Sequence, residues 1–135
     1  MTSDRLARAY LEKAKVRIKA LKFMHQEGGY SDVVREAQEC VELLLKGVLR
    51  CLGIEVPKIH DVSRLLRQRA DLLPAVLRDN LDEVARISRE LRKDRELAFY
   101  GTDDWIPTEE YSAQDSLEAI GKAERVFEIV SQVID

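Results

Sequence analysis

Five basic side chains in a ten-residue stretch are the clearest candidates for chemistry in this sequence. They are Arg86, Arg89, Arg92, Lys93 and Arg95, against two acidic residues in the same stretch. On a helix, Arg86, Arg89 and Lys93 share a face because their spacing is i, i+3, i+7. Guanidinium groups match phosphate oxygens in a bidentate manner, so this ridge could bind phosphate. The competing interpretation is a solvated face, since acidic residues four positions from Arg86 and Arg92 can form intrahelical ion pairs.

Other kinds of reactive site have little support. The two histidines, His25 and His60, fall in different segments, and the spacings CxxC, HxxxH and HExxH of metal sites are absent. The sequence also has no glycine-rich phosphate loop and no GxSxG turn. Cys40 lies on the apolar side of a predicted helix, which is a poor place for a thiolate nucleophile. We therefore expect neither a metal ion nor a cofactor.

Two acidic pairs, 103–104 and 109–110, flank Trp105 in the one long predicted loop. Clustered carboxylates could bind magnesium, but they also solvate loops and favour the positive N-terminus of a following helix, which is the interpretation we prefer. Trp105, Tyr100 and Tyr111 could stack on a base. We expect instead that these aromatic side chains close one end of the molecule.

The elements that position these residues are predicted to be helical throughout. Apolar residues recur at spacings of three and four, which predicts helices over 4–26, 32–52, 61–71, 75–99 and 113–134. Ser31 and Ser112 are expected to be N-caps, and the apolar stripe of the last helix is expected to begin at Leu117. No segment alternates with period two. We predict an all-α fold, an antiparallel up-and-down bundle of four long helices plus one short helix.

The predicted helix over 32–52 has the widest apolar face in the chain. Its width exceeds what one bundle is expected to bury, and the excess would suit a dimer interface.

Composition limits the class of protein further. With 135 residues, 45% of them hydrophobic and 35% charged, the chain fits one globular domain spanning 1–135, neither disordered nor membrane-spanning. A net charge of -3 excludes binding of nucleic acid through net charge alone. Cys40 and Cys51 would lie about 16 Å apart on one helix, too far for a disulfide. With no apolar signal segment at the N-terminus, we expect a cytoplasmic protein without membrane contact.

An ordered set of short motifs runs nearly end to end through the chain. The motifs are Tyr10–Ala14, Gly29–Asp32, Ala37–Lys46, Gly53–Ile54, Pro57–Asp61, Arg95–Gly101 and Tyr111–Asp115. In this order they resemble the HEPN domain (higher eukaryotes and prokaryotes nucleotide-binding), in its small standalone prokaryotic form. The resemblance implies an all-α bundle that commonly dimerises. Many members are metal-independent ribonucleases, often toxins paired with a small nucleotidyltransferase.

The hallmark of the family is an arginine followed after four to six residues by a histidine, at a cleft between protomers. The resemblance implies that the arginine binds phosphate and that the histidine assists proton transfer. Arg95 matches the arginine here, but Tyr100, Gly101 and Thr102 occupy the positions of the histidine. A phenol can donate a hydrogen bond to phosphate, yet it is a poor proton acceptor near neutral pH.

The candidate site residues follow from this comparison. We expect phosphate or nucleotide binding by Arg89, Arg92, Arg95 and Tyr100, and we assign no catalytic residue. His60 and Asp61 are expected to order the turn that opens the short third helix, rather than to bind a ligand.

The leading hypothesis is a homodimeric module that binds a nucleotide, an RNA or a partner nucleotidyltransferase in a toxin–antitoxin-type system, without strong catalysis of its own. The first alternative is a metal-independent endoribonuclease that uses Arg95 with Tyr100 or with His60. The second is a purely structural or antitoxin-like partner of another protein.

Overall fold

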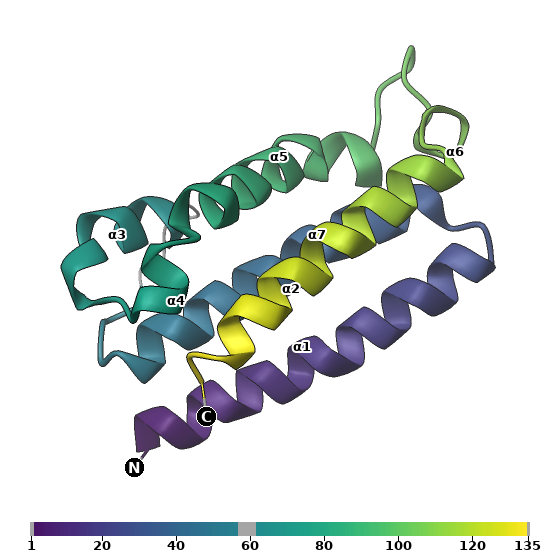
Figure 1. Ribbon diagram of the computed structural model, residues 1–135. Helices are drawn as coiled ribbons and strands as arrows, with labels where there is room; N and C mark the ends of the chain where they lie inside the picture. Colours follow the sequence, from purple (N-terminus) through teal and green to yellow (C-terminus); the bar gives the residue numbers. More distant parts are fainter. Residues whose placement is uncertain (1, 57–61, 135) are drawn as a thin grey trace.

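The computed structural model describes residues 2–56 and 62–134, and four long helices dominate them. Successive long helices run in opposite directions along the bundle, as Figure 1 shows, which confirms the predicted all-α up-and-down arrangement. These helices are α1 (Thr2–Gln26), α2 (Tyr30–Cys51), α5 (Leu81–Phe99) and α7 (Ala113–Ser131). None of the helices in the described ranges is both long and apolar enough to cross a bilayer.

The central helix of the bundle is α2, which packs against α1, α5 and α7. Its apolar positions are almost completely buried, and the fully enclosed side chains include Val33, Leu44, Leu45 and Leu49. The three surrounding helices of the same chain therefore cover the wide apolar face of α2. The expectation that this face has an excess left over for a dimer interface is wrong.

The short elements differ from the sequence prediction mainly between residues 62 and 80. The predicted third helix is α3 (Val62–Gln68), followed by a 3-10 turn, η1 (Ala70–Leu72). The predicted helix over 75–99 is split into α4 (Ala75–Arg78) and α5, because the Asn80 side chain donates to the Val76 carbonyl at 2.7 Å and favours a turn. The predicted roles of His60 and Asp61 lie outside the described residues.

The two predicted helix caps have different outcomes. Ser112 is the N-cap of α7: its hydroxyl accepts from the Asp115 amide at 3.2 Å, and the Asp115 carboxylate accepts from the Ser112 amide at 2.9 Å. The prediction for Ser31 is wrong, because α2 already begins at Tyr30 and Gly29 holds the N-cap position. Gly28, with a φ of +80°, makes the turn that ends α1. Ser31 is instead buried in the first turn of α2.

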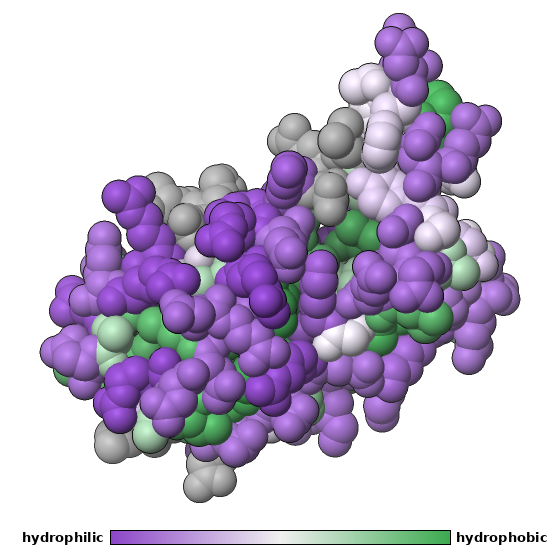
Figure 2. Space-filling view, turned by 45° about the horizontal axis from the view of Figure 1, so that its top comes forward, coloured by the Kyte–Doolittle hydropathy of each residue, from purple (hydrophilic) through white to green (hydrophobic). Residues whose placement is uncertain are grey.

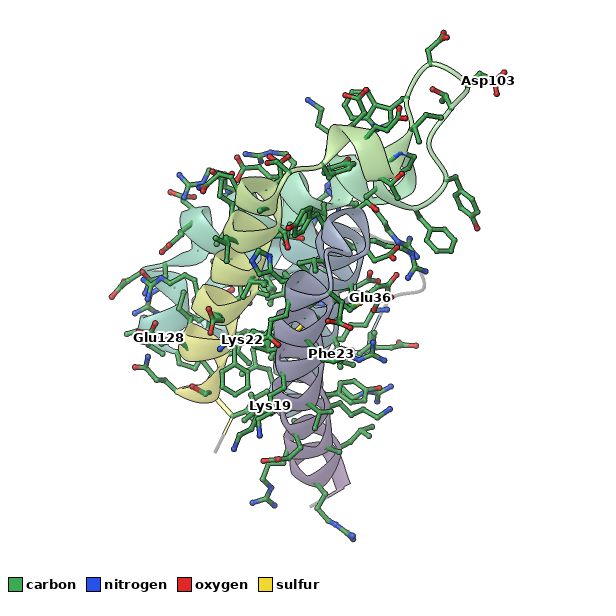
Figure 3. All side chains as sticks on the ribbon, turned by 90° about the vertical axis from the view of Figure 1, so that its right-hand side faces the viewer. Lys19, Lys22, Phe23, Glu36, Asp103 and Glu128 are labelled. Atoms are coloured by element: carbon green, nitrogen blue, oxygen red, sulfur yellow. The ribbon has the colours of Figure 1, made fainter. Side chains whose placement is uncertain are left out.

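Residues 100–111, which we call the arm, project from one end of the bundle (Figures 1 and 2). Thr102 and Trp105 pair through two backbone hydrogen bonds of 2.9 and 3.1 Å, and α6 (Pro107–Glu110) follows. Gly101 has a φ of +69°, and a side chain there would collide with Trp105 and Pro107. The tip carries Asp103, labelled in Figure 3.

The aromatic residues of this region divide into two groups. Trp105 and Tyr111 pack edge to face, with ring centroids 6.1 Å apart, and Tyr111 lies against the core, as expected for residues that close one end of the bundle. Tyr100 is 77% exposed, so the expectation that it closes one end of the bundle is wrong.

Leu117 is 51% exposed at the start of α7, where the apolar stripe of this helix was predicted to begin.

The buried thiol of Cys40 predicts a specific loss of stability in alkali. Desolvation raises the pKa of Cys40 from 9.0 to about 11, so ionisation is easier in the unfolded chain. The stability that this thiol contributes is therefore complete below pH 9 and is lost as pH rises toward 11. At about pH 10.5, the easier ionisation of Cys40 in the unfolded chain should lower the free energy of unfolding by about 2 kcal/mol.

Urea unfolding at neutral pH and at about pH 10.5 measures this effect. The alkaline loss should be about 2 kcal/mol smaller in Cys40→Ala than in the wild type. Cys51→Ala removes a half-buried thiol from the same helix and is the matched control. Equal alkaline losses in all three proteins would contradict the assignment to Cys40.

Candidate functional site

A strip of charged side chains lies along α2 between α1 and α5. Within the described residues these two outer helices share no extensive interface, so this side of α2 is left partly open. We call the strip the α2 groove. Its side chains are Arg17 from α1, Arg95 and Phe99 from α5, and Arg35, Glu36, Glu39, Glu42, Leu43 and Lys46 from α2.

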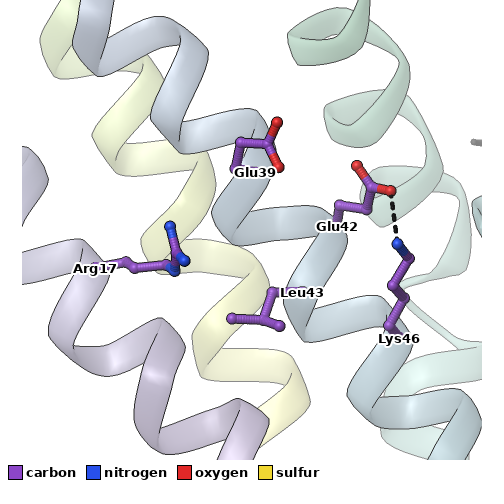
Figure 4. Close-up of a pocket in the computed structure, with 5 residues that line it drawn as sticks. All are labelled: Arg17, Glu39, Glu42, Leu43 and Lys46. Atoms are coloured by element: carbon purple, nitrogen blue, oxygen red, sulfur yellow. Dashed lines mark ion pairs between the residues drawn. The ribbon is translucent and has the colours of Figure 1, made fainter.

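The middle of the groove is a hollow of about 120 Å³ between α1 and α2, drawn in Figure 4. Arg17 extends across it from α1, and Glu39 and Leu43 lie on the α2 side. The Lys46 ammonium lies 3.0 Å from the Glu42 carboxylate, an ion pair between residues one turn apart on this helix. Glu42 also accepts a hydrogen bond from the buried amide of Gln38 at 3.2 Å.

Arg95 joins the groove from α5. Its Nη2 atom lies 2.6 Å from Oε1 of Glu39, so the guanidinium and the carboxylate form a short charge-assisted contact between α5 and α2. Both side chains remain about one-third exposed. An anion can therefore reach Arg95 from solvent, but it must compete with the carboxylate of Glu39.

A second set of contacts lies next to this pair. Nη1 of Arg35 lies 2.6 Å from one carboxylate oxygen of Glu36, while Arg17 approaches the other oxygen at 3.6 Å. The Arg35 guanidinium also lies 4.3 Å from the centre of the Phe99 ring, a cation–π contact with the end of α5. Positive and negative groups thus alternate along the groove, so three arginines are close together without a large net charge.

The residues predicted to bind phosphate do not form one cluster. Arg89 lies on the exposed outer face of α5, about 120° around the helix from Arg95, as six residues of helix require. Arg92 is half-buried between them and has an interaction partner. The Tyr100 ring packs against Phe99, 4.5 Å between centroids, and no hydrogen bond links Tyr100 to Arg95 in the described structure.

Among the described residues, no histidine lies in the groove. His25 lies elsewhere, with its Nδ1 atom 2.9 Å from the Ser116 hydroxyl at the α1–α7 contact. Within residues 2–56 and 62–134, no three His, Cys, Asp or Glu side chains converge as a metal site would require. What the groove offers an incoming group is guanidinium, ammonium and carboxylate.

Sequence reasoning missed Glu39 and Arg35 as site residues, although a signal was present. Glu36, Glu39 and Glu42 interrupt the most apolar helix of the chain at spacings of three. On a helix that is otherwise buried, such spacing marks a single charged stripe that needs solvent or partners.

The fold and the groove together define an all-α bundle with an arginine-containing cleft along its central helix. The sequence pattern of the HEPN domain matches residues 7–133, so this chain belongs to the HEPN domain family. A protein named "Putative toxin MJ1304", from Methanocaldococcus jannaschii, is 25% identical over 134 residues, which cover 95% of this chain and 88% of that protein. The crystal structure of ST0689, an archaeal HEPN homologue, matches with a TM-score of 0.71 and 24% identity, covering 96% of this chain and 98% of that one.

Proposed function

We propose that this HEPN protein binds a phosphate-containing ligand, a nucleotide or an RNA, in the α2 groove. It does so as a homodimer, or together with a partner nucleotidyltransferase, in a toxin–antitoxin-type system. The observation that carries the proposal is the position of Arg95, which matches the family arginine and extends from α5 to the groove, within 2.6 Å of Glu39. The name of the Methanocaldococcus relative supports the toxin–antitoxin setting.

The groove suits a ligand that takes over the role of the Glu39 carboxylate. A phosphate oxygen can accept the same guanidinium hydrogen bonds, with Arg35 on α2 as a further cation of the groove. Strong catalysis is not part of the proposal, because the family histidine is replaced and no described histidine lies in the groove. Tyr100 belongs to the arm rather than to the arginine cluster.

Binding of ATP and of a short single-stranded RNA tests the proposal. Arg95→Ala should weaken binding about tenfold or more, because a charge-assisted hydrogen bond to phosphate is lost. Arg89→Ala is the matched control, since it removes the same charge from the outer face of the same helix. It should change the affinity less than about threefold.

Two outcomes would contradict this assignment. Equal losses in the two variants would mean that only general charge attracts the ligand, and equal binding to the wild type would place the ligand elsewhere. Metal-independent cleavage of the RNA in EDTA, absent from Arg95→Ala, would favour the ribonuclease alternative. Co-purification with a protein partner, without any binding of ATP or RNA, would favour the structural or antitoxin-like one.

A further inference from the structure

α1 is a strongly basic helix in a protein whose net charge is negative. Residues 2–26 contain seven lysines and arginines and only two acidic residues, although the whole chain has a net charge of -3. By contrast, α5 has five basic and five acidic residues. Among the long helices, α1 therefore has the largest excess of basic over acidic residues.

The side of α1 that points away from the bundle combines this charge with exposed apolar groups. Val16 and Phe23 are 64% and 62% exposed, and they lie two turns apart on the side opposite the buried residues Ala14, Ile18 and Leu21. We call this surface the α1 outer face. Its members are Lys13, Val16, Lys19, Ala20 and Phe23, and one carboxylate, Glu12, lies among them beside Lys13 and Val16.

The lysines of this face are available to a partner. Lys22 and Arg17, at its two margins, pair with Glu124 at 2.9 Å and with Glu36 at 3.6 Å. Lys13 and Lys19 lie nearer the centre, and in the described part of the chain neither has an acidic group within ion-pair distance. An acidic partner could thus approach without breaking an existing pair.

The arm has the complementary character. Its twelve residues include four exposed carboxylates, Asp103, Asp104, Glu109 and Glu110, and no basic side chain. Tyr100 and Ile106 expose apolar surface beside them. The Thr102–Trp105 pairing and the Gly101 turn give the arm a fixed shape. Its tip at Asp103 projects beyond the helices, as Figure 3 shows, while α6 contacts α2 and α5.

We propose that the arm of one copy docks on the α1 outer face of a second copy. Both surfaces combine exposed apolar groups with charge, and the two charges are of opposite sign, which is the complementarity that steers and orients association. Because the contact joins two different patches, a closed dimer contains it twice, related by a two-fold axis. This inference rests on the homodimer in the proposed function and is independent of phosphate binding by Arg95.

A charge swap tests the contact by sedimentation velocity across a range of protein concentrations. The arm variant carries Asp103→Lys and Asp104→Lys, and the helix variant carries Lys13→Glu and Lys19→Glu. Each should weaken self-association about tenfold or more, because like charges then face each other. The combined variant has the net charge of the wild type and opposite charges in contact again, so its association should return to within about threefold of the wild type.

Four outcomes would overturn the proposal. The dimer could persist unchanged in the arm and helix variants, which would leave the proposed homodimer intact but place its interface elsewhere. The combined variant could remain as weakly associated as either single swap. The wild type could be monomeric at every concentration, which would also remove the homodimer from the proposed function. Loss of RNA binding in the helix variant, with association unchanged, would make the α1 outer face a nucleic-acid surface instead.

Discussion

Replacing Glu39 with glutamine is expected to tighten phosphate binding, with a dissociation constant for ATP about tenfold lower than that of the wild type. The carboxylate lies 2.6 Å from the Arg95 guanidinium, where a phosphate oxygen would otherwise bind. Glutamine keeps the size of the side chain but removes the negative charge that competes with the ligand. Titration calorimetry with ATP measures the change.

Glu42→Gln is the matched control for this substitution. It makes the same chemical change three residues along α2, on a carboxylate that pairs with Lys46 rather than with Arg95. Its effect on ATP binding should be smaller than that of Glu39→Gln. If Glu39→Gln binds ATP no better than the wild type, the Glu39–Arg95 pair only joins α2 to α5 and does not occupy a phosphate site.

Leu44→Ala is expected to lower the free energy of unfolding by about 2–5 kcal/mol. Leu44 is fully buried on α2, the helix that contacts the three other long helices, so the cavity left behind cannot be filled by movement of one neighbour alone. Such a loss is a large part of the stability of a domain of this size, about 5–15 kcal/mol. Urea unfolding followed by far-UV circular dichroism measures it.

Leu117→Ala makes the same substitution where the side chain is half exposed at the start of α7. Its cost should be below about 1 kcal/mol, since little apolar surface is returned to water. Equal costs at the two positions would mean that α2 is not the centre of the core.

Much of the fold could be predicted from sequence because it depends on periodic burial. The stripes of α1, α2 and α7 and the cap at Ser112 follow from side-chain spacing and local hydrogen bonding. The break at Asn80 could not be predicted in this way, because Leu77, Leu81 and Val84 on either side continue the helical period. A side-chain hydrogen bond, rather than a change in apolar pattern, ends the regular helix there.

The candidate site was predicted in part. Arg95 was identified by its place in the family motif, and its contact with Glu39 adds a position in space. Arg89 was grouped with it because both belong to one basic run, but six residues of helix place them on different faces. Glu39 and Arg35 could not be paired with their partners on α5 from spacing, since such contacts depend on how α2 and α5 pack.

The central position of α2 has a consequence for how the chain is made. α2 is complete at residue 51, whereas α7, which covers much of its apolar surface, begins at residue 113. A nascent chain emerging from the ribosome can pair α1 with α2 early, because they are joined by a short turn, but it must wait for its last helix before the core closes. Until then the most apolar segment of the protein is incompletely covered, which is the state in which partly made chains aggregate or engage chaperones.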